Sequence, residues 1–186
     1  MDAYVGIDLG STTTKAVFLD EHDHLLGFGI TNSRSDYDVA CQIAREEAEI
    51  NSRFSILRRE MKTLVPGDDH DVLVAWLYQK YRLAQHTRQL IALSAACRKA
   101  VDLLPVAEHR KPTHAVLDAI LADMEHEAIG LFKPGAEARS DFFRDIAAAT
   151  FLHLSEKKAG DDSKLLDRLI GTFDKSILLV ESKSYA

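Results

Sequence analysis

Cysteine is scarce in this chain of 186 residues, and its two copies, Cys41 and Cys97, stand far apart in the sequence. Neither belongs to a C-x-x-C pair, and neither has a histidine at ligand spacing, which argues against a zinc site or a redox motif. We therefore expect two reduced, buried thiols. The sequence also lacks an apolar run of membrane-spanning length and the basic and apolar regions of a signal peptide. These absences predict a cytoplasmic protein with no membrane partner.

Positive charge is in deficit as well. The 23 lysines and arginines are outnumbered by 29 aspartates and glutamates, which leaves a net charge of −6. Such a chain does not attract the phosphate backbone of a nucleic acid, so we expect no nucleic-acid partner. The hydrophobic content of 46% is ordinary for a globular protein and is sufficient for a packed core.

Residues 3–31 alternate between apolar and polar positions, as strands do. Turn-forming residues interrupt this pattern twice, at Gly10-Ser11-Thr12 and over residues 20–24. The N-terminal segment is therefore predicted to form three antiparallel strands in a meander.

From Asp36 onward, apolar residues recur at the spacing of an amphipathic helix. We expect one helix that ends near residue 66, a second over residues 71–104, a third that begins at Pro112, and a fourth from about residue 142 to 158. Residues 160–163 should cap a short helix that ends near Gly171. The run Ile177-Leu178-Leu179-Val180 is compatible with a returning strand. The expected organisation is thus a β-meander at 1–35, a helical lobe at 36–172 and a C-terminal segment at 173–186.

The first turn carries residues suited to binding phosphate. Glycine allows backbone N–H groups to approach phosphate oxygens, hydroxyls add further donors, and a lysine on the next strand can neutralise charge. The candidate nucleotide ligands are Gly10, Ser11, Thr12, Thr13 and Lys15. Asp8, at the end of the first strand, is the candidate ligand for Mg²⁺, through water, because that ion keeps much of its hydration shell. The competing interpretation is a plain hairpin whose aspartate and glycine serve only the turn.

The segment Gly6–Val17 reads GIDLGSTTTKAV. Its turn joins two apolar strands, and in this it resembles the phosphate-binding hairpin of the actin/Hsp70/sugar-kinase superfamily. It closely resembles the ATPases that activate benzoyl-CoA reductase and 2-hydroxyacyl-CoA dehydratase. Residues 29–35 (GITNSRS) and 44–48 (AREEA) are similar to the benzoyl-CoA reductase alpha-type subunit in particular. The resemblance implies a ribonuclease H-like α/β ATPase lobe, followed by a mainly helical insertion.

The resemblance also implies a function. Its members bind ATP and Mg²⁺ and drive an electron from ferredoxin through a [4Fe–4S] cluster toward an aromatic acyl-CoA. The implied partners are the other reductase subunits, including a second ATPase-type subunit. The family's cluster-binding cysteines, its second phosphate segment and its adenosine segment have no counterpart in this sequence, so we expect a chain that is truncated after the helical insertion.

Two other functions stay open at this point. A sugar or acetate kinase of the same superfamily would need a substrate-binding acid in its second half, and a helical assembly module could retain the hairpin without turnover. Glu46 and Glu47 begin a helix that could close over a nucleotide, although a solvated role is the ordinary interpretation. His114 and Asp118 have the i, i+4 spacing of metal ligands but lack a third ligand at defined spacing.

Overall fold

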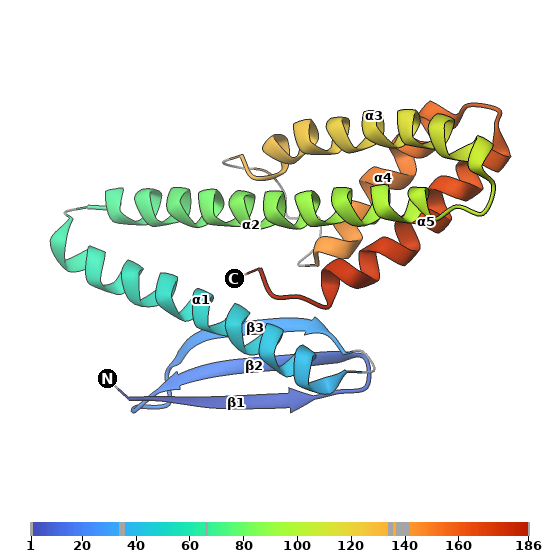
Figure 1. Cartoon of the computed structure of the whole chain (residues 1–186). Coiled ribbons are helices and arrows are strands. Elements are labelled where there is room, and N and C mark those ends of the chain that lie inside the picture. The colour runs from blue at the N-terminus through green and yellow to red at the C-terminus, as the bar shows by residue number, and fades with distance from the viewer. Residues whose placement is uncertain (1, 34–35, 66, 134–135, 137–141, 186) are drawn as a thin grey trace. The chain divides into compact units, whose positions relative to one another are not determined.

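The computed structural model describes residues 2–33, 36–65, 67–133, 136 and 142–185. Over these residues the protein is mixed α/β, with a three-stranded sheet followed by five helices (Figure 1). The chain divides into two compact units, Met1–Tyr81 with Ser182–Ala186, and Arg82–Glu181. The division therefore falls inside the second helix and again at the end of the fifth. The segments predicted from the sequence were 1–35, 36–172 and 173–186.

The sheet is the antiparallel meander that the sequence predicts. Its strands β1 (Ala3–Leu9), β2 (Thr13–Asp20) and β3 (Leu25–Asn32) lie in the order β1-β2-β3. The β1–β2 ladder is regular over its whole length, while the β2–β3 ladder shifts register between Phe18 and Leu19.

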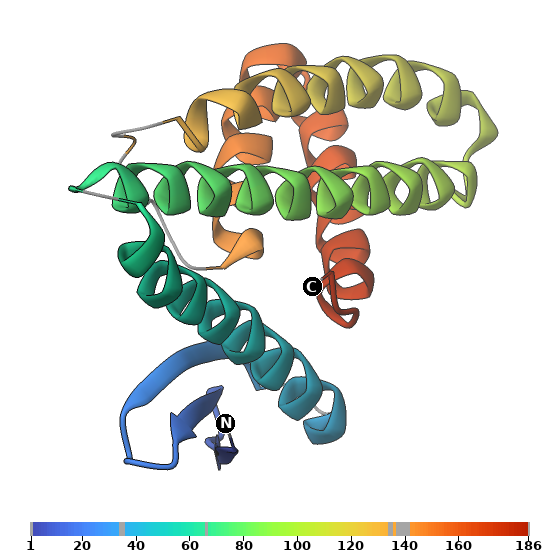
Figure 2. The same ribbon diagram turned by 90° about the vertical axis from the view of Figure 1, so that its left-hand side faces the viewer.

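Helix α1 (Tyr37–Leu64) lies along one face of this sheet (Figures 1 and 2). Asp36 caps its N-terminus, because the Asp36 carboxylate accepts a hydrogen bond from the Val39 N–H at 3.1 Å. The helix start predicted at Asp36 is confirmed. The buried residues of α1 are all small: Ala40, Ala44, Ala48 and Ser52. Two of them, Ala44 and Ala48, pack with Ala16 of β2 into a core cluster.

Two glycines of β3 allow α1 to approach the sheet backbone. A Cβ atom at Gly29 would collide with the Ala44 carbonyl oxygen, and one at Gly27 would collide with backbone atoms of α1. Asn51 strengthens the contact, since its Nδ2 donates to the Phe28 carbonyl oxygen at 2.7 Å. The backbone of α1 therefore packs almost directly on the backbone of β3. This close contact fixes the position of β3 against the helix.

The remaining helices are α2 (Asp69–Asp102), α3 (Ala107–Leu131), α4 (Phe143–Ala159) and α5 (Ser163–Glu181). Within the second unit, α4 and α5 pack against each other, and stacked rings of Phe151 and Phe173 lie 4.6 Å apart at their centroids. The Asp162 carboxylate accepts from the Leu165 N–H at 2.9 Å, so the predicted cap before α5 is present.

Two expectations about the helices are wrong. The run Ile177–Val180 is not a strand, and the helix does not end near Gly171: both segments belong to α5. The buried positions Leu165, Leu169 and Phe173 recur at four-residue intervals and extend to Ile177. The run therefore continues the buried face of the helix, although its composition also suits a strand.

The third helix also begins earlier than predicted. It starts at Ala107, so Pro112 lies inside the helix instead of at its first residue. A proline at this position removes one N–H close to the helix start, which costs a single backbone hydrogen bond. Arg110 helps to fix this end, since its Nε and one terminal nitrogen both donate to the Leu104 carbonyl oxygen, at 3.0 and 2.7 Å.

Candidate phosphate-binding hairpin

The β1–β2 turn is built around Gly10. The Gly10 N–H donates to the Thr13 carbonyl oxygen at 3.1 Å and closes the turn. A Cβ atom at residue 10 would lie only 2.6 Å from that same oxygen, a distance that real Cβ atoms essentially never show. This position therefore requires glycine for close approach of the backbone, as the sequence suggested, although the group approached here is the turn's own carbonyl.

The tip of the turn points into solvent. Ser11 and Thr12 are exposed, and Thr13, the first residue of β2, is half-buried. Among the residues that the structure describes, the backbone N–H groups of Ser11 and Thr12 have no backbone acceptor. The tip thus presents two hydroxyls and two amides that can donate to an anion.

Asp8 and Lys15 face each other directly across β1 and β2. The Asp8 Oδ2 and Lys15 Nζ atoms are 3.8 Å apart, and the two side chains are 71% and 46% exposed. An ion pair as exposed as this contributes little to stability. Because side chains alternate along a strand, Thr13 lies on the same face as Lys15. The structure therefore brings the predicted residues together on one face beside the turn.

Helix α1 lies on the other face. Ala16 and Phe18 of β2 contact α1, and alternation directs Lys15 away from it. Glu47 lies over Gly29 on the α1 side of the sheet, and Glu46 accepts a hydrogen bond from Gln42 within the helix. Glu46 and Glu47 therefore belong to the α1 side of the sheet, opposite the face that carries Lys15.

Two residues missed by the sequence analysis hold the turn in place. The Thr14 and Ser33 hydroxyl oxygens are hydrogen-bonded at 2.7 Å, and Thr14 is completely buried. The Ser33 N–H also donates to the Thr12 carbonyl oxygen at 2.8 Å. Ser33, which directly follows β3, thus holds the β1–β2 turn in place through these two hydrogen bonds. The sequence signals were the positions of Thr14 in GIDLGSTTTKAV and of Ser33 in GITNSRS; Arg34 and Ser35 of the latter lie outside the described residues.

The donor set agrees in part with Mg²⁺. Mg²⁺ bound with nucleotide needs only one or two carboxylates, because waters and phosphate oxygens complete its octahedron. Asp8 offers one accessible carboxylate at the end of β1. In the described part of the chain, no group of three or more histidine, cysteine, aspartate or glutamate side chains could hold a metal ion by itself. A magnesium ion here would depend on the nucleotide for its remaining ligands.

The cysteines do not match the requirements of a [4Fe–4S] cluster, which takes four thiolates. Cys41 is a half-buried residue of α1, whereas Cys97 is buried in the part of α2 that belongs to the second unit. Burial raises the pKa of the Cys97 thiol to about 11, which disfavours the thiolate that iron requires.

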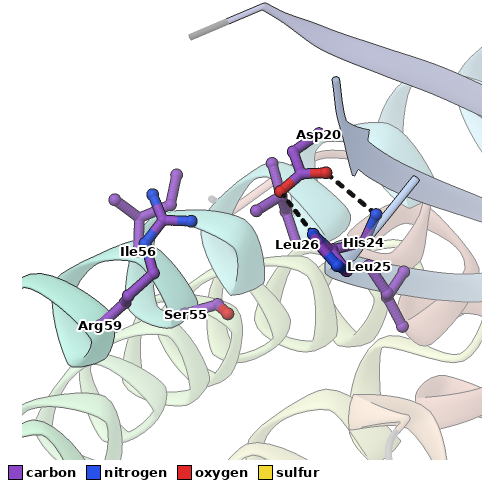
Figure 3. A pocket seen from close by; sticks show the side chains of 7 residues that line it. All are labelled: Asp20, His24, Leu25, Leu26, Ser55, Ile56 and Arg59. Atoms are coloured by element: carbon purple, nitrogen blue, oxygen red, sulfur yellow. Dashed lines mark hydrogen bonds and ion pairs between the residues drawn. The ribbon is translucent and has the colours of Figure 1, made fainter. Parts of the chain in front are cut away.

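A separate hollow of about 240 Å³ lies between the β2–β3 turn and α1 (Figure 3). Its polar centre is Asp20, whose carboxylate accepts from the backbone N–H groups of His22 and His24, both at 2.9 Å. The His24 N–H, more than any other group, holds the pKa of Asp20 below its usual value. These bonds stabilise the turn, in which Asp23 adopts a left-handed conformation with φ 61°. The hollow is lined by Asp20, His24, Leu25, Leu26, Ser55, Ile56 and Arg59.

The pair His114 and Asp118 does not form a common site. His114 Nε2 lies 2.8 Å from Asp102 Oδ1, and Asp118 accepts from Arg98 Nε at 2.8 Å. Each residue therefore links α3 to the C-terminal half of α2, which is a structural role.

The comparisons with known proteins add no family. No family model matches the chain, and searches of curated proteins and of solved structures found no similar protein. None of the helices in the described ranges combines the length and apolar composition that crossing a bilayer requires.

Proposed function

We propose that this chain is the ATP-binding subunit, or the N-terminal portion of one, of a complex like benzoyl-CoA reductase. One observation carries the proposal: the GIDLGSTTTK segment forms a tight hairpin with Asp8, Lys15 and Thr13 on one face beside an exposed glycine-hydroxyl tip. A plain hairpin would need the glycine alone. The charged pair beside the tip favours a phosphate-binding role over that simpler interpretation.

The roles of the residues follow from their chemistry. The amides and hydroxyls of Ser11 and Thr12 would donate to phosphate oxygens, and Lys15 would exchange its bond with Asp8 for one with phosphate. Asp8, released from Lys15, would then hold a water of the Mg²⁺ shell. The exposed, weakly coupled ion pair can open at little cost, which suits a site that rearranges on binding.

The larger function rests on the sequence resemblance. In such a complex, ATP hydrolysis would drive an electron from ferredoxin toward an aromatic acyl-CoA, with the cluster and further nucleotide contacts supplied by other subunits or segments. Co-purified subunits that contain iron would support this function. Phosphotransfer to a sugar or to acetate would support the kinase alternative instead.

The Asp8→Asn variant tests the nucleotide site. We expect MgATP to bind about tenfold more weakly, because losing a metal-positioning group typically costs 10- to 100-fold. Isothermal titration calorimetry with MgATP gives the affinities, and circular dichroism checks the fold. Asp174→Asn is the matched control, since this exposed aspartate of α5 belongs to the second unit and its loss changes the net charge equally. Equal affinities for Asp8→Asn and wild type would refute the role of Asp8.

A further inference from the structure

The β2–β3 turn carries two histidines two residues apart. His22 and His24 have side chains that are 71% and 75% exposed, and their ring centroids lie 6.1 Å apart. When two imidazoles share one metal ion, metal–nitrogen bonds of about 2.0–2.1 Å place their centroids between about 4.5 Å, for a right-angled pair, and about 6.4 Å, for a linear one. The two rings therefore stand within reach of a single ion.

A buried carboxylate fixes the tautomer of one ring. Asp20, the last residue of β2, is only 5% exposed, and its Oδ2 lies 3.2 Å from His24 Nδ1 (Figure 3). A neutral His24 therefore carries its proton on Nδ1, which leaves the lone pair on Nε2. Histidines that bind metals almost always donate their second ring N–H to a carboxylate, a carbonyl or water. The Asp20–His24 pair has this arrangement.

The same carboxylate holds the backbone that carries both rings. Asp20 Oδ1 accepts from the backbone N–H groups of His22 and His24, both at 2.9 Å. His22 Nε2 lies 3.9 Å from Glu21 Oε1, which is beyond hydrogen-bond distance. Within the described chain, neither Nε2 atom has a hydrogen-bond partner, so both lone pairs are available to a ligand.

The charge around the two rings favours a cation. Asp20, Glu21 and Asp23 place three carboxylates within the five residues of the turn. Arg59 faces them from α1 across the hollow shown in Figure 3, and its Nε lies 3.4 Å from the Glu60 carboxylate. Negative charge thus exceeds positive charge at the turn, and the nearest guanidinium has a carboxylate of its own helix beside it.

We propose that His22 and His24 bind one divalent transition-metal ion through their Nε2 atoms, with Asp20 as the outer carboxylate that orients His24. Imidazole selects zinc, nickel and copper, whereas Mg²⁺ and Ca²⁺ require oxygen ligands. Two protein ligands are fewer than the four of a structural zinc site, so water occupies the remaining positions. This number agrees with the lack of a three-residue metal-binding group in the described ranges.

The proposed site differs from a simple turn cap in what it requires of the histidines. Capping the turn needs only the Asp20 carboxylate and two backbone N–H groups, which any residues at positions 22 and 24 supply. The ion pair between Asp20 and the 75% exposed His24 contributes little to stability. The inference is independent of nucleotide binding, because it uses neither Asp8 nor the β1–β2 turn.

Calorimetric titration with Zn²⁺ tests the proposal on the whole chain, treated with EDTA and free of nucleotide. The wild type should bind one Zn²⁺, and His22→Gln/His24→Gln should bind at least tenfold more weakly, because only the carboxylates of the turn remain. His126→Gln/His153→Gln, at exposed histidines of α3 and α4, removes the same number of imidazoles and should retain the wild-type affinity. Mg²⁺ at the same concentration should not displace Zn²⁺. Equal affinities for His22→Gln/His24→Gln and wild type would overturn the proposal.

Two further measurements identify the ligands. Zn²⁺ should shift the Nε2 resonances of His22 and His24 in nitrogen-15 spectra of the imidazole rings, a change that a purely structural role would not produce. Asp20→Asn keeps an acceptor for the two backbone N–H groups, and should weaken Zn²⁺ binding by 10- to 100-fold, as the loss of an outer carboxylate typically does. Resonance shifts confined to other histidines, or a Zn²⁺ affinity lost in Asp8→Asn but kept in His22→Gln/His24→Gln, would place the ion elsewhere and overturn the proposal.

Discussion

At the scale of single residues, the hairpin depends on how closely atoms approach within the turn. Gly10 is required because of the Thr13 carbonyl oxygen, and the Thr14–Ser33 hydroxyl pair joins the turn to the end of β3. These contacts fix the backbone, while Ser11 and Thr12 remain exposed. The turn therefore combines a rigid frame with accessible donors, the arrangement that anion binding by backbone amides requires.

The Gly10→Ala variant tests that frame. Its Cβ would collide with the Thr13 carbonyl oxygen and force the turn to open, so MgATP should bind at least tenfold more weakly while the helical circular dichroism stays unchanged. A fluorescent ATP analogue measures the affinity. Ser11→Ala removes one hydroxyl but keeps the turn, and its smaller loss gives the comparison. An unaltered affinity in Gly10→Ala would show that the turn geometry is irrelevant to nucleotide binding.

At the scale of elements, α1 packs closely on β3 because neither surface carries large side chains at the contact. The helix presents alanine and serine, and the strand presents glycine at residues 27 and 29. The helical period from Asp36 onward predicted the helix but not this face. Small residues carry little hydrophobic signal, so sequence periodicity could not identify the side of α1 that is buried.

The Gly29→Ala variant should destabilise the first unit by about 1–3 kcal/mol, because its methyl group overlaps the Ala44 carbonyl oxygen and neither backbone can move easily. Hydrogen exchange of α1 amides reports the change. Gly130→Ala in α3 is the matched control, since its Cβ meets nothing within 4 Å and should stabilise the helix by about 0.5–1 kcal/mol. Equal stability of Gly29→Ala and wild type would contradict the backbone contact.

Much of the fold was predictable from local patterns. Alternation and turn residues predicted the meander, and Asp36 predicted the start of α1. The end of α5 was not predictable, because a short apolar run such as Ile177–Val180 fits either a strand or the buried turn of a helix. At the candidate site, the turn residues were proposed from their chemistry, whereas Ser33 acts through tertiary contacts that leave no local pattern.

At the scale of the whole molecule, the two compact units should respond differently to acid. His86 of the second unit is buried beside the rings of Phe132 and Phe143, and burial lowers its pKa to about 4. Asp20 of the first unit has a pKa below its usual 3.8. The histidine titrates in the unfolded chain near pH 6.5, so its effect begins at milder acidity than that of the aspartate.

We therefore expect the second unit to lose stability first as the pH falls. Between about pH 6.5 and 4 the unfolded chain binds a proton at His86 that the folded unit resists, which costs about 3 kcal/mol once the pH reaches 4. Asp20 stabilises the first unit above pH 3.8, and that contribution disappears only as the pH falls through its lower folded pKa. Hydrogen exchange at several pH values follows each unit separately.

His86→Leu should remove most of the second unit's pH dependence between pH 6.5 and 4, because leucine has no proton to bind. His126→Gln, at an exposed histidine of α3, should leave that dependence unchanged. A second unit whose stability is flat over this range in the wild type would contradict the buried, neutral state of His86.

Residues 1–186 alone should release phosphate from ATP at close to the background rate. The candidate ligands of the nucleotide all lie on one hairpin of the first unit, at Asp8, Lys15 and the turn between them. Phosphoryl transfer requires charge stabilisation from several directions and a positioned nucleophile, which a single exposed hairpin does not provide. Such a site can orient phosphates without accelerating their hydrolysis.

Steady-state phosphate release, measured with the purified monomer and MgATP, checks this expectation. The Asp8→Asn variant serves as the control, because any release that persists in it at the wild-type rate comes from a contaminating ATPase and not from the hairpin. Turnover at ordinary enzyme rates, about 1 per second or faster, that is lost in Asp8→Asn would contradict the prediction. It would mean that groups beyond the hairpin complete a catalytic site within the chain itself.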